Sequence, residues 1–134
     1  MKTGVYVETL EPEILIEQDV KGILAEFGCD VGMGFDLPYG GISGERAAYY
    51  DRYLRAMDVL RESGVRLFLW PLARKNDGYW LNEKNVDVFS AGLESFSEYA
   101  QRAGVGVPGF IYDIETPWNQ GTVFTAAAKK SDRR

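Results

Sequence analysis

The stretch LRESGVRLFLWPL, residues 60–72, contains the junction on which the fold depends. Gly64 ends a helical pattern, because glycine readily adopts the left-handed conformation that closes a helix. Residues 65–70 are apolar at nearly every position and are followed by Pro71, so they predict a short strand. A helix that leads directly into a strand indicates an α/β protein.

The same succession of helix, glycine and strand occurs three times along the chain. Gly28, Gly64 and Gly104 each end a helical pattern and precede a strand, at an interval of about 40 residues. That interval matches one strand, one helix and two loops. The expected strands are residues 5–7, 29–36, 65–70 and 107–115. Their alternation with helices predicts a parallel sheet.

Four strand–helix units are half of a TIM-type (β/α)₈ barrel, a fold that needs about 250 residues in full. The chain has 134 residues. We predict that residues 1–117 form the first four units of such a barrel. Residues 118–134 show no convincing periodicity and are predicted to be a weakly structured tail. An open flavodoxin-like sheet is the alternative architecture.

Composition limits the chemistry and the partners. The sequence has no histidine, which excludes histidine nucleophile systems and histidine metal ligands. Its single cysteine, Cys29, cannot form an internal disulfide. No apolar run approaches the roughly 18 residues of a membrane span, and the net charge of −5 disfavours nucleic acid. Since the start of the chain also lacks a signal-peptide pattern, we expect a cytoplasmic protein. We also expect no cofactor.

Polar and aromatic side chains stand where the expected strands end, which is the edge that carries binding sites in parallel α/β proteins. The residues at these positions are Glu8, Asp36, Trp70, Arg74, Asp113 and Glu115. Asp113 and Glu115 point to the same face, because side chains alternate along a strand. Two carboxyl groups so close together suit a protonated general acid beside an ionised carboxylate.

Aromatic side chains are expected to surround this edge. Trp70 ends the third strand, and Tyr79 and Trp80 lie in the polar loop that follows it. Flat apolar rings of this kind can stack on sugar rings or other planar ligands. The same positions have a simpler interpretation, in which Trp70 belongs to the core and Asp36 forms a turn.

The segment of residues 109–115 resembles the catalytic segment of barrel glycoside hydrolases, because the fourth strand ends in Asp113-x-Glu115. The chitinase-like families and the lysozyme-like muramidases share this feature. The resemblance implies that Glu115 is the acid–base residue and that Asp113 supports it or the substrate. It covers residues 109–115 well and the remaining order of elements only loosely.

The leading hypothesis is therefore a carbohydrate-active hydrolase domain that cleaves glycosidic bonds with Glu115 and Asp113. The residues expected to contact the carbohydrate are Glu8, Asp36, Trp70, Arg74, Tyr79 and Trp80. A Mg²⁺ or Mn²⁺ site made of Glu8, Asp36, Asp113 and Glu115 is one alternative. A non-catalytic open-sheet module is another. Half a barrel exposes unpaired strand edges, so we expect a homodimer or a missing C-terminal half.

Overall fold

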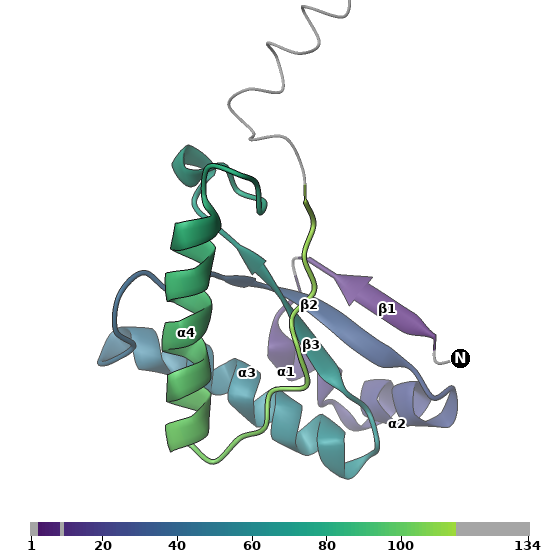
Figure 1. Ribbon diagram of the computed structural model, residues 1–134. Coiled ribbons are helices and arrows are strands. Elements are labelled where there is room, and N and C mark those ends of the chain that lie inside the picture. Colours follow the sequence, from purple (N-terminus) through teal and green to yellow (C-terminus); the bar gives the residue numbers. More distant parts are fainter. Residues whose placement is uncertain (1–2, 9, 115–134) are drawn as a thin grey trace, which may run out of the picture.

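The computed structural model describes residues 3–8 and 10–114 (Figure 1). Its sheet has three parallel strands in the order β1–β2–β3. The strands are β1 Gly4–Val7, β2 Asp30–Asp36 and β3 Leu67–Leu72. The mixed α/β class and the parallel sheet expected from the sequence are confirmed.

Helices separate the strands as the alternating pattern predicts. They are α1 Pro12–Leu15, α2 Gln18–Glu26, α3 Glu45–Glu62 and α4 Val86–Arg102, with a 3₁₀ turn η1 at Lys75–Asp77. Gly28, Gly64 and Gly104 all have positive φ angles between 61° and 74°. These three glycines end their helices in the left-handed conformation, as the sequence indicates.

One face of the sheet packs against the helices and forms the main core. Val31, Met33 and Phe35 of β2 point into this core and are at most 1% exposed. The Phe35 ring lies 5.1 Å from the ring of Phe96 in α4 and 5.9 Å from that of Tyr53 in α3, measured between centroids. The residues that the helices add to the same core include Leu15, Leu24, Leu60 and Ala100. The helices α1 to α4 therefore all lie against this face.

The opposite face of the sheet has small residues in its middle and aromatic residues around them. Gly32 of β2 lies between Tyr6 of β1 and Phe68 of β3, and Gly34 is paired with Trp70. Tyr6 is 66% exposed, and Phe68 and Trp70 are partly exposed. We call this surface the open face.

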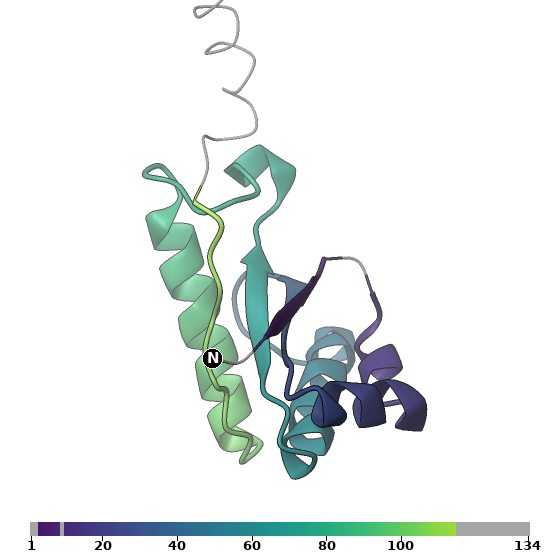
Figure 2. The same cartoon turned by 90° about the vertical axis from the view of Figure 1, so that its right-hand side faces the viewer.

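Within the described residues 107–114, the expected fourth strand is present as isolated bridges to β3 and to Leu81. Residues 107–114 run beside β3 (Figures 1 and 2). The Leu69 N–H donates to the Gly109 carbonyl at 3.2 Å, and the Ile111 N–H donates to the Leu69 carbonyl at 2.8 Å. Parallel bridges join Leu69 to Phe110 and Leu81 to Ile114.

Two further expectations concern the ends and the environment of the chain. The predicted tail, residues 118–134, lies outside the described residues. None of the helices within residues 3–8 and 10–114 has both the length and the apolar character needed to cross a bilayer.

Candidate functional site

Several of the predicted site residues lie at the carboxyl edge of the sheet. Glu8 directly follows β1, Asp36 is the last residue of β2, and the loop of residues 73–85 follows β3. Because the three strands are parallel, these segments meet at the same edge. The loop carries Arg74, Tyr79 and Trp80.

A hydrogen bond joins the first and third units across this edge. The Tyr79 hydroxyl donates to Oε1 of Glu8 at 2.6 Å. Gly78 and Tyr79 both have positive φ angles, 97° and 64°. This conformation is uncommon for a residue with a side chain, and its strain is balanced by the contacts of the loop. Burial and then the bond to Glu8 raise the pKa of Tyr79 to about 12, so its hydroxyl is a donor at neutral pH.

Two buried asparagines hold the loop in this conformation. Asn82 and Asn85 are 5% and 3% exposed. The Asn85 amide donates to the carbonyls of Asp77 and Trp80, at 2.8 Å each, and the Asn82 amide donates to the Trp80 carbonyl at 2.9 Å. The main chain of Trp80 is thereby fixed. Its ring packs edge-on against Tyr79, with 5.0 Å between centroids.

Asp36 is positioned by a chain of tyrosine hydroxyls from α3. The Asp36 N–H donates to the Tyr49 hydroxyl at 2.9 Å, and the Tyr53 hydroxyl donates to the Gly34 carbonyl at 3.2 Å. The two hydroxyls lie 3.1 Å apart. Because the Tyr53 hydrogen is used on Gly34, Tyr49 must donate to Tyr53. Tyr50 completes the support by donating to the Asp36 carbonyl at 2.9 Å.

These hydroxyls keep their protons over a wide pH range. Burial raises the pKa of Tyr50 to about 12, although the nearby Arg46 guanidinium lowers it in part. Burial also raises the pKa of Tyr49 and Tyr53. The Asp36 main chain is therefore fully hydrogen-bonded by neutral donors and acceptors, while its side chain stays at the exposed end of the strand.

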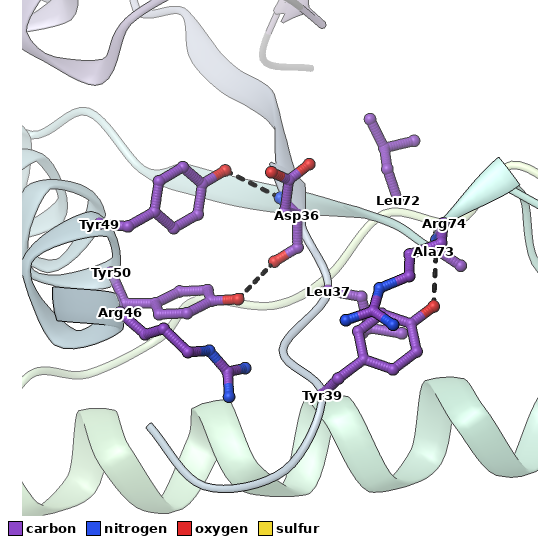
Figure 3. Close-up of a pocket in the computed structure, with 9 residues that line it drawn as sticks. All are labelled: Asp36, Leu37, Tyr39, Arg46, Tyr49, Tyr50, Leu72, Ala73 and Arg74. Carbon is purple, nitrogen blue, oxygen red and sulfur yellow. Dashed lines mark hydrogen bonds between the residues drawn. The ribbon is translucent and has the colours of Figure 1, made fainter. Parts of the chain in front are cut away.

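A cavity of about 380 Å³ lies beside Asp36 (Figure 3). This volume is within the range of small-molecule pockets. Its lining includes Asp36, Leu37, Arg46, Tyr49, Leu72 and Arg74. The Arg74 guanidinium lies over the Tyr39 ring, 4.1 Å from its centroid. The Tyr39 hydroxyl accepts a hydrogen bond from the main-chain N–H of Arg74 at 3.0 Å and donates one to Oδ2 of Asp77 at 2.7 Å.

A second cavity, of about 150 Å³, brings two predicted carboxylates together. Glu8 and Asp36 both line it, next to Gly34. Asp36 and Tyr49 also line the larger cavity, so the two hollows share a wall. The ends of the first and second strands therefore lie beside one hollow, and their role in a site stays a prediction.

Two other predicted site residues, Trp70 and Asp113, are not among the residues that line these two cavities. Trp70 lies on the open face, paired with Gly34, and is partly exposed rather than in the main core. Asp113 is partly exposed. The residues that follow Asp113 and Trp80, Ile114 and Leu81, form a parallel bridge, so Asp113 lies near the aromatic loop. Glu115 lies outside the described residues, and the geometry of its pair with Asp113 stays a prediction.

The metal alternative gains no support from the part of the chain that the structure describes. Within residues 3–8 and 10–114, no three or more acidic or cysteine side chains are grouped so that they could hold a metal ion. Glu8, Asp36 and Asp113 are thus not a ligand cluster. Its fourth proposed member, Glu115, falls outside the range.

Sequence reasoning missed the contribution of α3 to the site. Tyr49 and Tyr53 are four residues apart and so lie on one side of the helix. A buried tyrosine needs a partner for its hydroxyl. Three tyrosines within residues 49–53, close behind the end of a strand, are a signal that could have indicated this support. Arg46 gave no such signal, because a charged residue near a helix start is typical of a solvated surface.

Comparisons with protein-family models, curated proteins and solved structures found no match to this chain. The function of the protein is therefore inferred from the site geometry and from the residues themselves.

Proposed function

We propose that this chain is part of a barrel-type glycoside hydrolase whose carbohydrate site lies at the carboxyl edge of the sheet. The observation that carries the proposal is the 2.6 Å bond between Tyr79 and Glu8, beside a cavity that Glu8 shares with Asp36. Three consecutive strand–helix units thus contribute side chains to one place. Barrel enzymes build their active sites in this way.

The side chains at this edge match the chemistry of a sugar. Carboxylates such as Glu8 and Asp36 accept hydrogen bonds from hydroxyl groups. Trp80 and Tyr79 offer aromatic surface within the same loop, and aromatic rings pack well against the apolar faces of pyranose rings. A site that combines the two can orient a sugar unit at the strand ends.

The carboxyl pair at the end of the fourth segment, Asp113 and Glu115, cleaves the glycosidic bond. Glu115 donates its proton to the glycosidic oxygen as the bond to the anomeric carbon breaks, and Asp113 stabilises the positive charge that develops there. Water then adds to the anomeric carbon and loses a proton to the carboxylate that has just been deprotonated. Both carboxyl groups are required by this type of reaction.

The open face supports the barrel architecture in this proposal. In a closed barrel this side of the sheet is the interior, filled by side chains from all strands. Here the lining of a hollow of about 270 Å³ includes Tyr6, Gly32, Phe68 and Ile111. Further strand–helix units, or a second copy of the chain, cover this face in the functional protein. Sedimentation velocity distinguishes the two, since only the second gives a concentration-dependent dimer.

The catalytic assignment is tested by Glu115→Gln, with Glu98→Gln as the control. Glu98 is an exposed carboxylate on α4, outside both cavities. Reducing-end release from a panel of oligosaccharides is measured for each variant. Loss of a general acid costs about 10²–10⁴-fold in rate, and the control is expected to keep the parent rate. Equal activity in all three proteins rejects the assignment.

A further inference from the structure

We propose that the 380 Å³ cavity selects an acidic sugar, a hexuronic acid unit whose carboxylate is held by Arg46 and Arg74. This inference rests on the proposed function, because it names the substrate class of that same site. It starts from two guanidinium groups that approach one cavity from different elements, α3 and the loop after β3.

Neither of these arginines forms an ion pair within residues 3–8 and 10–114. Arg46 donates to the Gly41 carbonyl at 3.1 Å, and Arg74 stacks on Tyr39. By contrast, several arginines elsewhere in the described chain are paired with carboxylates. These are Arg52 with Glu13, Arg61 with Asp58 and Arg66 with Asp30. A guanidinium has five N–H donors, so Arg46 and Arg74 keep most of theirs for a ligand.

The stacking of Arg74 favours a planar anion. The Tyr39 ring fixes the plane of the guanidinium. Tyr39 is itself held by hydrogen bonds to the main-chain N–H of Arg74 and to the Asp77 carboxylate. A guanidinium with a fixed plane can pair with a carboxylate through two parallel hydrogen bonds. The loss of side-chain entropy on binding is small, because Arg74 is already oriented.

Asp36 narrows the choice among anions. Asp36 lines the same cavity, and its negative charge repels a ligand that is anionic throughout. Figure 3 shows the Asp36 carboxylate on a different side of the pocket from the two guanidinium groups. A ligand that satisfies both sides carries hydroxyls for Asp36 and a single carboxylate for the arginines. A hexuronic acid unit has this arrangement.

The test compares acidic oligosaccharides with their methyl esters. Galacturonate, mannuronate and glucuronate oligomers are each titrated by calorimetry into the full chain, beside the matched methyl ester, which keeps the hydroxyls but removes the charge. We expect at least one acid to bind tenfold or more tightly than its ester. Arg46→Gln and Arg74→Gln are each expected to remove most of that preference, so that the acid and its ester bind with similar affinity.

Arg55→Gln is the matched control, because Arg55 lies exposed on α3, outside the cavity, and its loss changes the net charge equally. If all three substitutions have an equal effect, the preference for the acid over its ester depends on overall charge, and the inference is overturned. If esters bind as well as acids, the inference fails while the proposed carbohydrate site stands. If neither these sugars nor neutral oligosaccharides bind, both proposals fail. Circular dichroism of each variant confirms that the fold is intact.

Discussion

The hydroxyl of Tyr79 donates a 2.6 Å hydrogen bond to Oε1 of Glu8, across 71 positions of sequence. This bond ties the loop after β3 to the end of β1, passing over the end of β2 between them. It therefore fixes the relative position of the first and third units at the candidate site. Because Glu8 follows only a four-residue strand, this bond is a main restraint on its position.

Replacing Tyr79 with phenylalanine is expected to lower the free energy of unfolding by about 1 kcal/mol, the usual size of one hydrogen bond. Glu8 is exposed, so water replaces the lost donor and a larger effect is not expected. Urea denaturation measures the change. Tyr112→Phe is the control, since Tyr112 is 44% exposed and forms no hydrogen bond in the described part of the chain. Equal losses in both variants would contradict a specific role for the bond.

The tyrosines also predict a loss of stability at alkaline pH. The folded pKa values of Tyr50 and Tyr79 are raised to about 12, above the value near 10 of an unfolded tyrosine. Folding thus favours the protonated form. The stabilisation is fully present below pH 10 and is lost as the pH rises through 12. Urea unfolding at pH 8, 10 and 11 should show a falling stability, with a shallower fall in Tyr79→Phe. A flat profile would contradict the buried environment of these hydroxyls.

Gly34 offers a test of how closely β1 and β2 approach at the site. A Cβ atom on Gly34 would lie 2.7 Å from the Glu8 carbonyl oxygen, so Gly34→Ala must displace the end of β1. We expect a loss of roughly 1–3 kcal/mol in unfolding free energy, as for other overpacked positions. Gly22→Ala in α2 is the opposite control, because nothing lies within 4 Å of its Cβ position. It should gain about 0.5–1 kcal/mol.

Much of the framework follows from local patterns. The strands expected at residues 5–7, 29–36 and 65–70 agree with the observed bounds within about two residues. The reason is that apolar runs of β-branched and aromatic residues next to glycine stops strongly favour short strands. The meeting of Glu8, Asp36 and Arg74 at one edge then follows from parallel topology alone.

What local patterns could not predict depends on contacts between distant residues. The continuity of the fourth strand depends on how residues 107–114 meet β3 rather than on their apolar character. The support of Asp36 by Tyr49 requires the axial position and rotation of α3, which periodicity does not fix. The left-handed conformation of Tyr79 is likewise imposed by the loop, since Asn82 and Asn85 hold its neighbours.

The two faces of the sheet should respond differently to the loss of a phenylalanine. Phe35 is 1% exposed and packs against Phe96 and Tyr53, so Phe35→Ala is expected to cost about 3–5 kcal/mol. Phe68 lies on the open face and is only partly buried, so Phe68→Ala in the monomer should cost about 1 kcal/mol, because less apolar area returns to water.

Protein concentration is the control for this comparison. Denaturation is measured at a concentration at which sedimentation shows a monomer, and again at higher concentration. If a second copy covers the open face, the cost of Phe68→Ala grows with concentration while that of Phe35→Ala does not, because only the dimer buries Phe68. Equal costs of the two substitutions in the monomer would contradict an open face and, with it, the argument that this side of the sheet is an unfilled barrel interior.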